Sequence, residues 1–182
     1  MTPPAPPLPA PTSTTFVAVA LGSNTGPSGT SLRAALDRLR SLARGDFRAS
    51  SLWRSSPVDC PPGSPDFLNA AACFDVAASE SPESLLATLQ AWEREFGRRP
   101  KQVLNEPRPL DLDLLVFGSE TRCAPSLILP HPRAHLRRFV LEPLAEIAPD
   151  LHPPGWAATV ARTLAGLVSD EMLERLPEGF GS

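Results

Sequence analysis

The sequence predicts an α+β domain in which helices pack on one antiparallel sheet, with strands and helices in the order β-α-β-β-α-β. Three observations support this prediction. Several short segments are either continuously apolar or alternate apolar and polar residues, as strands do. Two longer segments repeat apolar residues at helical spacing, and glycine or proline stands at most of their boundaries. The length of 182 residues suits one domain with a substantial core.

The first strand is predicted at residues 16–21, a short apolar run typical of a buried strand. A helix follows, because Thr30 or Ser31 can cap its first turn and Gly45 can end it. One face of this helix is apolar and carries Leu32, Leu36, Leu39 and Ala43.

Two further strands are predicted at residues 47–55 and 67–76, separated by a proline-rich loop at 57–65. Alternation along the later strand places Phe67 and Asn69 on one face. The other face of that strand carries Leu68, Ala70, Ala72 and Phe74.

The second helix is predicted to begin at Ser81-Pro82-Glu83, since proline suits the first helical position and an acid suits the positive end of the helix dipole. Its apolar stripe contains Leu85, Leu86, Leu89, Trp92 and Phe96, and Gly97 ends it. A fourth strand follows at 111–117. The resulting order is that of ferredoxin-like domains. The expected C-terminal additions are an apolar piece at 126–129, a short helix at 143–148 and a terminal helix at 156–168.

We expect a single domain at residues 16–168, preceded by a disordered proline-rich extension at 1–15 and followed by a tail at 169–182. The net charge of -3 provides no basic footprint for nucleic acid or an anionic membrane. No apolar run approaches the ~20 residues of a membrane-spanning helix. Three widely spaced cysteines indicate a reducing cytoplasm rather than a disulfide framework. These features predict a cytoplasmic protein, which we expect to be a monomer.

The most informative segment is 108–117, which sets Asp111 and Asp113 one residue apart in an apolar, strand-like run. Strand alternation points both carboxylates the same way, with their Cα atoms roughly 6–7 Å apart, close enough to share bound cations. Leu115 and Phe117 are predicted to continue that face, which favours a strand that leaves a core for a charged cleft. The alternative is a surface strand with its leucines inward and both aspartates in water.

Four separated stretches, in this order and spacing, closely resemble the 6-hydroxymethyl-7,8-dihydropterin pyrophosphokinases of folate biosynthesis. They are Leu21-Gly22-Ser23-Asn24, Pro65-Asp66-Phe67-Leu68-Asn69-Ala70, Pro107-Arg108-Pro109-Leu110-Asp111-Leu112-Asp113 and Leu129-Pro130-His131-Pro132. The resemblance runs from about Phe16 to Pro153. It implies transfer of a pyrophosphoryl group from ATP to the hydroxymethyl oxygen of the pterin, with release of AMP.

The resemblance also implies which residues meet the phosphates. Asp111 and Asp113 offer hard oxygen ligands, and in the family they hold two Mg²⁺ ions, with ATP as co-substrate. Cations are expected nearby because the transferred group is polyanionic. The implied catalytic residues are Arg98, Arg108, Asp111 and Asp113. The implied ATP-binding residues are Gln90, Glu93, Lys101, His131 and Arg137.

A pterin is a flat heterocycle with a guanidine-like edge, so aromatic plates and amide or carbonyl acceptors suit it. Phe67 and Asn69 offer both, and the resemblance implies that Phe139 is a second stacking ring. The implied pterin-binding residues are Ser55, Ser56, Val58, Phe67, Asn69 and Phe139. Simpler alternatives remain open: plain core for Phe67, a favourable cation at a helix C-terminus for Arg98, and solvated surface for Gln90 and Glu93.

The chain departs from the family pattern mainly in and around residues 98–106. Asn105-Glu106 replaces a usual Trp-Gly, and Leu104, Pro100 and Pro132 replace other frequent residues. These departures bear on loop closure and nucleotide affinity more than on the type of reaction. Two other functions are consistent with the carboxylate pair, a two-metal phosphatase or nuclease and a binding module without activity. A P-loop kinase is excluded because its Gly-x4-Gly-Lys-Ser/Thr motif is absent.

Overall fold

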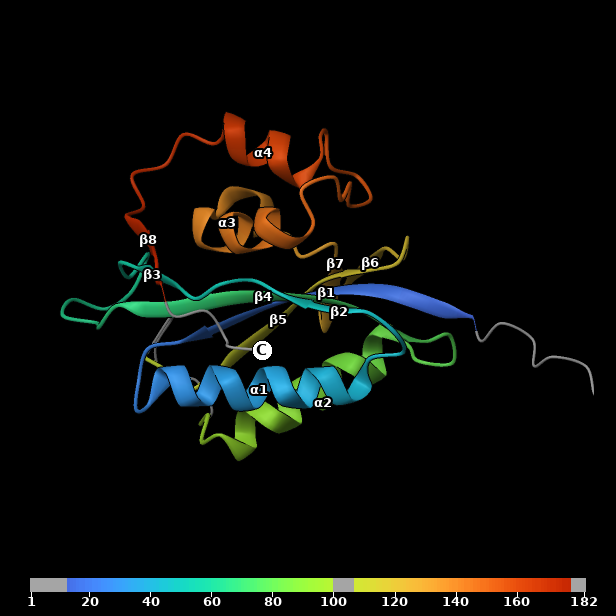
Figure 1. Ribbon diagram of the computed structural model, residues 1–182, viewed down its shortest axis with the longest axis horizontal. Coiled ribbons are helices and arrows are strands. Elements are labelled where there is room, and N and C mark those ends of the chain that lie inside the picture. Colours follow the sequence, from blue (N-terminus) through green and yellow to red (C-terminus); the bar gives the residue numbers. More distant parts are fainter. Residues whose placement is uncertain (1–12, 100–106, 178–182) are drawn as a thin grey trace, which may run out of the picture.

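The computed structural model describes residues 13–99 and 107–177, which form a six-stranded sheet and a two-stranded sheet (Figure 1). The larger sheet has the strand order β5-β1-β4-β3-β8, and β2 also pairs with β4. Its strands are β1 (Thr14–Ser23), β2 (Phe47–Ala49), β3 (Trp53–Ser55), β4 (Phe67–Ala77), β5 (Asp111–Phe117) and β8 (Leu173–Arg175). The smaller sheet pairs β6 (Arg122–Ala124) with β7 (Leu127–Leu129).

Helices cover both faces of the large sheet (Figure 1). On one face lie α1 (Ser28–Leu42) and α2 (Pro82–Glu95), and on the other lie α3 (Arg138–Ile147) and α4 (Val160–Gly166), after a 3-10 turn at Ala134–Leu136. Two separate apolar layers result. The layer under α1 and α2 is built from large aliphatic residues, whereas β1 and β4 present Ala18, Ala20 and Ala71 to the α3 side.

The predicted ferredoxin-like core is confirmed, with β1, α1, β2 and β3, β4, α2 and β5 in sequence and antiparallel pairing throughout this core. The strand predicted at 47–55 is divided into β2 and β3. The division occurs where the Ala71 N–H donates to Ser50 Oγ at 2.9 Å. A serine hydroxyl there takes the place of a backbone acceptor, so the regular ladder is interrupted between the two short strands.

Three predicted helix boundaries are wrong. The first helix begins at Ser28, because Pro27 is its N-cap and the Pro27 carbonyl already accepts from Ser31 N–H at 3.0 Å. The helix expected at 143–148 begins at Arg138, so Pro143 lies inside α3 rather than at its start. The helix expected at 156–168 is limited to α4, because residues 156–159 are not helical. By contrast, Ser81 caps α2 as predicted and accepts from Ser84 N–H.

Both predicted ends of the domain differ from the structure. Thr14 and Thr15 pair with Ala77 and Val76, so β1 begins within the extension expected at 1–15. Residues 1–12 and 178–182 lie outside the described residues. The expected tail at 169–182 contains β8, which pairs with β3 and belongs to the sheet. Among the described residues, no helix is both long and apolar enough to cross a membrane.

A β-bulge in β5 alters the predicted arrangement around the aspartates. Val19 pairs with Leu114, but its neighbour Ala18 pairs with Val116, so Leu115 is the extra residue. Leu115 lies in the layer on the α3 side, as Ala20, the partner of Asp113, does. Phe117, however, lies in the opposite layer, under α1 and α2. The expectation that Phe117 continues the aspartate face is therefore wrong, because the bulge shifts the alternation by one residue.

Candidate active site

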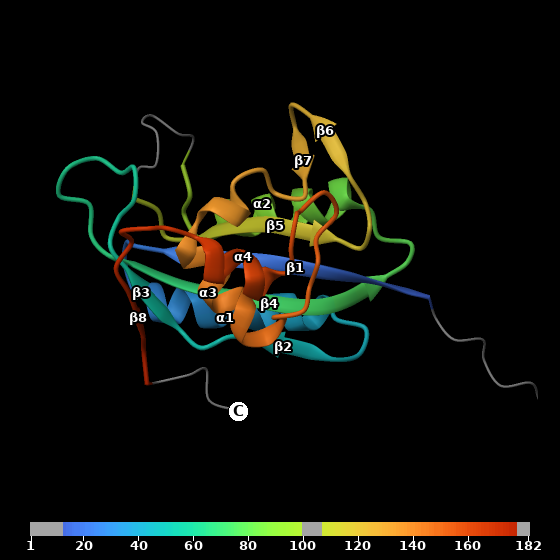
Figure 2. The same ribbon diagram turned by 90° about the horizontal axis from the view of Figure 1, so that it is seen from above.

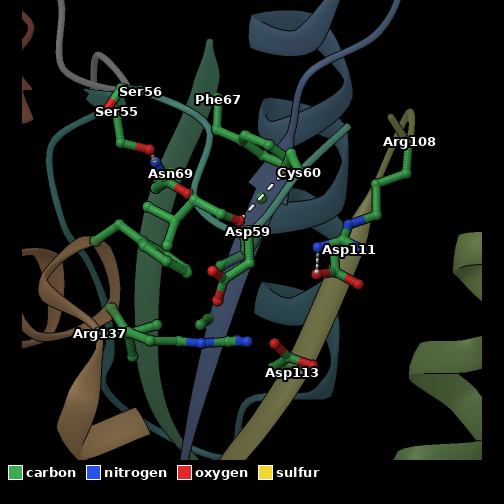
Figure 3. Close-up of a pocket in the computed structure, with 16 residues that line it drawn as sticks. Ser55, Ser56, Asp59, Cys60, Phe67, Asn69, Arg108, Asp111, Asp113 and Arg137 are labelled. Carbon is green, nitrogen blue, oxygen red and sulfur yellow. Dashed lines mark hydrogen bonds and ion pairs between the residues drawn. The ribbon is translucent and has the colours of Figure 1, made fainter. Parts of the chain in front are cut away.

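A pocket of about 650 Å³, counting the open space at its mouth, lies at one end of the large sheet (Figure 3). Its walls come from β1, β3, β4 and β5, from the loop after β3 and from the beginning of α3. All six residues predicted to bind pterin line it, namely Ser55, Ser56, Val58, Phe67, Asn69 and Phe139. Arg108, Asp111, Asp113 and Arg137 line it as well. The fold thus brings together residues from five separated stretches of sequence.

Asp111 is neutralised by two arginines. Its Oδ1 lies 2.8 Å from Arg98 Nη1, and its Oδ2 lies 3.0 Å from Arg108 Nη2. Both arginines were predicted to be catalytic, and the structure places both of them beside Asp111. The simpler alternative for Arg98, a cation at a helix C-terminus and nothing more, does not explain its contact with β5.

Asp113 is in a different electrostatic environment. Its Oδ2 lies 4.0 Å from His131 Nε2, and the Arg137 guanidinium extends toward it from the beginning of α3 (Figure 3). Burial raises the pKa of Asp113 to about 7, helped by the negative charge of Asp111 and opposed by Arg137 and Arg108. A nearby cation would stabilise the ionised form of such a carboxylate.

His131 is held close to Asp113 by its backbone, since its N–H donates to the Leu115 carbonyl at 2.9 Å. Burial lowers the pKa of His131 to about 4, and the positive charges of Arg137 and Arg133 act in the same direction. The imidazole is therefore neutral at neutral pH, and its approach to Asp113 is a polar contact rather than an ion pair. His131 also lines a separate open groove with His135 and Trp156.

Glu93 connects α2 to β5. Its side chain is buried, and its Oε1 accepts from Leu112 N–H at 2.7 Å and from the Arg98 guanidinium. Burial raises the pKa of Glu93, while the Leu112 N–H and Arg98 oppose the rise. The alternative of solvated surface is wrong for Glu93, whereas Gln90, one turn earlier, is exposed. Both residues line a second cleft beside Arg98 and Asp113.

Arg108 is fixed by Asn24, at the end of the first family-like stretch. Asn24 Oδ1 accepts from Arg108 N–H at 2.8 Å, and the Arg108 carbonyl accepts from Asn24 N–H at 3.1 Å. The guanidinium carbon lies 5.7 Å from the centroid of the Phe67 ring, within range of a cation–π contact. Within the described part of the chain, the buried Arg108 Nε has no hydrogen-bond partner.

The wall predicted to bind the pterin is partly organised by Asn69. This buried amide donates from Nδ2 to Ser55 Oγ at 2.8 Å, which orients the side chain across β3 and β4 (Figure 3). A Cβ added to Gly22 would lie 3.7 Å from Asn69 Oδ1 and 3.9 Å from atoms of both Phe67 and Asp111. A side chain longer than alanine at position 22 would therefore enter the space between these groups.

The sequence did not identify Gly22, Asp59 and Cys60 as pocket residues. Gly22 lies inside a quoted family-like stretch, which was the available signal. Asp59 and Cys60 lie in the proline-rich loop, where no periodicity indicates which side chains turn inward. Burial raises the pKa of the Cys60 thiol, so the thiol is protonated at neutral pH. Lys101 and the departures at Pro100, Leu104, Asn105 and Glu106 lie outside the described residues.

Fold and site together define a ferredoxin-like α+β protein with a paired-carboxylate pocket whose wall is aromatic and amide in character. Residues 18–149 match the family of 7,8-dihydro-6-hydroxymethylpterin-pyrophosphokinase (HPPK). The chain belongs to this family. The match covers every residue that lines the pocket, since all of them fall between positions 20 and 140.

Several relatives carry the name 2-amino-4-hydroxy-6-hydroxymethyldihydropteridine pyrophosphokinase. The relative from Pseudomonas aeruginosa is 40% identical over 165 residues, which cover 88% of this chain and 96% of the relative. The relative from Synechocystis sp. is 39% identical over 146 residues, which cover 80% of this chain and 73% of the relative.

Among solved structures, the wild-type HPPK-DHPS protein of Plasmodium falciparum with SDX-DHP is similar, with a TM-score of 0.67 and 13% sequence identity. The similarity covers 84% of this chain and 44% of that chain, so this chain spans less than half of the solved protein's length. At this identity the likeness concerns the fold alone, which it supports independently of the sequence motifs.

Proposed function

We propose that this chain transfers a pyrophosphoryl group from ATP to the hydroxymethyl oxygen of 6-hydroxymethyl-7,8-dihydropterin, giving the pterin diphosphate and AMP in folate biosynthesis. The observation that carries the proposal is a single pocket that combines the Asp111–Asp113 pair with the wall of Phe67, Asn69 and Phe139. Family membership and the names of relatives 39% and 40% identical to this chain support it.

In this proposal the pterin ring lies between Phe67 and Phe139, which face the pocket from β4 and α3. Stacking of this kind contributes about 0.5–1.5 kcal/mol beyond burial. Asn69 is held in place by Ser55 and offers its amide oxygen to the donor edge of the pterin. Ser56 and Val58 close the pocket from the loop after β3.

The residues present fit Mg²⁺. Asp111 and Asp113 provide only oxygen ligands, and Mg²⁺ in nucleotide sites commonly uses one or two carboxylates together with phosphates and water. Burial, helped by the charge of Asp111, raises the pKa of Asp113, and a bound cation would stabilise this carboxylate in its charged form. We propose that the two carboxylates hold two Mg²⁺ ions with bound ATP. Bound Mg²⁺ would neutralise charge on the phosphates during transfer.

The arginines act on the same phosphates. The reaction forms a bond between the hydroxymethyl oxygen and the β-phosphorus and breaks the bond from that phosphorus to the oxygen that leaves with AMP. Charge therefore accumulates on phosphate oxygens, which cationic donors stabilise. Arg98 and Arg108 flank Asp111 and Arg137 extends toward Asp113, so we assign these three residues to phosphate binding. His131 and Gln90 are proposed to contact the nucleotide, and Lys101 is proposed to contact it from the segment at 100–106.

Glu93 has a different proposed role from the one implied by the resemblance alone. Because its carboxylate is occupied by Leu112 N–H and Arg98, we propose that it positions Arg98 and β5. A direct contact between Glu93 and ATP is the weaker interpretation, since it would require the carboxylate to leave these partners.

The test is release of AMP from ATP and Mg²⁺ with and without 6-hydroxymethyl-7,8-dihydropterin. Pterin-dependent AMP without matching ADP is the expected result. Release of orthophosphate without pterin would instead indicate the two-metal phosphatase. Binding of both ligands without AMP would indicate a binding module. Either of these outcomes contradicts the proposed pyrophosphoryl transfer.

The location and oligomeric state remain proposals based on composition: a cytoplasmic monomer. Cys60, Cys73 and Cys123 are all free thiols, which is compatible with a reducing compartment. A mass near 19.5 kDa by light scattering would support the monomer, and a mass near twice that value would contradict it.

A further inference from the structure

The chain after α4 returns across the molecule to the edge of the large sheet (Figure 2). We call residues 169–176 the C-terminal strap. Within it β8 pairs antiparallel with β3, with Leu173 opposite Ser55. Two backbone hydrogen bonds extend this pairing. Ser56 N–H donates to the Met172 carbonyl at 3.2 Å, and Leu176 N–H donates to the Leu52 carbonyl at 2.8 Å. The strap is therefore joined to β3 and to the residue that follows it, and so to two pocket residues, Ser55 and Ser56.

The strap also caps α3. The first amides of a helix have no partner within the helix and need an acceptor from elsewhere. The N-cap residue Arg137 provides no side-chain cap, and the first turn of α3 contains no acidic residue. Glu171 provides the acceptor from the strap, since Phe139 N–H donates to Glu171 Oε2 at 3.0 Å. Its negative charge at a helix N-terminus is also favourable.

Glu171 is itself held by the strap. Its N–H donates to Ser169 Oγ at 3.1 Å, which fixes the backbone just before the capping carboxylate. The next residue, Met172, has a side chain that is 77% exposed, so its link to Ser56 depends on its backbone carbonyl rather than on burial. The strap thus reaches the pocket mainly through hydrogen bonds.

These contacts end on two walls of one pocket. Phe139 belongs to the wall formed by α3, and Ser56 belongs to the wall formed after β3. We propose that the C-terminal strap is a positioning element of the pterin pocket, with Glu171 as a positioning residue that acts through the backbone of Phe139. By holding both walls, the strap preorganises the gap that the flat ring enters. This inference rests on the function proposed above.

The test compares Glu171→Ala and Glu171→Gln with Glu174→Ala as a matched control. Glu174 lies in the same strap, but its carboxylate pairs with Arg54 outside the pocket. The measurements are the Kd for 6-hydroxymethyl-7,8-dihydropterin with a non-hydrolysable ATP analogue present, the Kd for that analogue alone, and the melting temperature of each variant.

We expect Glu171→Ala to weaken pterin binding about tenfold, the effect of losing one charge-assisted hydrogen bond that orders the wall. The Kd for the ATP analogue should stay within about twofold of the wild-type value. Glu171→Gln retains an acceptor oxygen and should recover most of the affinity for pterin. Glu174→Ala should bind both ligands as the wild type does.

Two results would overturn the inference. One is that Glu171→Ala weakens the binding of pterin and of the ATP analogue equally. The other is a pterin Kd for Glu171→Ala within about twofold of the wild-type value. If Glu171→Ala does not fold, Ser169→Ala is the test variant, because it removes the hydrogen bond to the Glu171 N–H and keeps the Glu171 carboxylate. A selective loss of pterin affinity of about threefold supports the positioning role, and wild-type affinity contradicts it. If the wild type binds pterin and forms AMP while these variants are unchanged, only this inference fails. If the wild type binds no pterin, the proposed function fails with it.

Discussion

Replacing Glu93 with alanine should destabilise the fold while leaving the nucleotide contact proposed for Gln90 on α2 in place. The carboxylate is only 5% exposed and accepts from Leu112 N–H at 2.7 Å as well as from Arg98. In the alanine variant the Leu112 amide is left buried without its acceptor, which costs about 1–3 kcal/mol. Arg98 keeps Asp111 as a partner at 2.8 Å, so its charge is not left unpaired.

With the loss of packing around the removed side chain, we expect the free energy of unfolding to fall by about 2–4 kcal/mol. For a domain of this size, that corresponds to a decrease in melting temperature of roughly 4–16 °C. Glu93→Gln should cost less, because an amide oxygen can still accept from Leu112 N–H and the buried charge is removed. Burial raises the pKa of Glu93, which indicates that the carboxylate is itself costly to keep charged there.

The assay is urea unfolding of wild type, Glu93→Ala, Glu93→Gln and Gln90→Ala. Stabilities are compared from the urea concentration at the unfolding midpoint, provided that the dependence of the unfolding free energy on urea is the same for all four proteins. Gln90 is the matched control because it lies one turn earlier on the same helix, lines the same cleft and is exposed. Its replacement should change stability by less than about 0.5 kcal/mol. If Glu93→Ala unfolds at the same midpoint as Gln90→Ala, the connection between α2 and β5 does not stabilise the fold as argued.

Three further predictions concern the pocket and the strap. Asp113→Asn should reduce turnover at least about a hundredfold without lowering the melting temperature, since it removes a disfavoured charge; near-normal turnover would refute the proposed metal role. Asn69→Ala should raise the KM for pterin far more than the KM for ATP in steady-state assays, and equal effects would contradict its assignment. Hydrogen bonds from Ser51 and the charge of Arg175 outweigh burial and hold the pKa of Glu146 below its usual value. Its stabilising effect should therefore be present at neutral pH and disappear as pH falls through this lowered pKa; a melting-temperature gap to Glu146→Gln that persists in acid would refute this.

Most of the ferredoxin-like core could be predicted because its signals are local. The Ser81-Pro82 start of α2 satisfies its own amides within one turn, so sequence and structure agree there. The errors occur where a distant partner decides the local structure. Ser50 interrupts the second strand by bonding to Ala71, and the bulge at Leu115 arises only in the pairing of β5 with β1. Neither contact has a signature in the segment that it alters.

The same distinction applies to the site. Residues inside the four family-like stretches, such as Asn69 and Asp111, were identified because a short motif preserves their spacing. Glu93 was assigned to the nucleotide from the family resemblance, but burial against Leu112 gives it a different environment. Glu171 was placed in a tail, since nothing local indicates that it caps a helix that begins more than thirty residues earlier.

The two aspartates at the centre of the site are chemically unequal, although the sequence presents them as a pair. Asp111 already has two arginine partners, and each of its oxygens makes one of these contacts, so it organises the cationic side of the pocket. Asp113 faces a neutral His131 and has a pKa of about 7, because burial and Asp111 disfavour its charge more than Arg137 and Arg108 favour it. A cation entering the site therefore gains most from Asp113, whereas at Asp111 it competes with Arg98 and Arg108. We therefore expect loss of Asp111 to disturb the arrangement of the arginines, and loss of Asp113 to remove cation binding from an otherwise intact pocket.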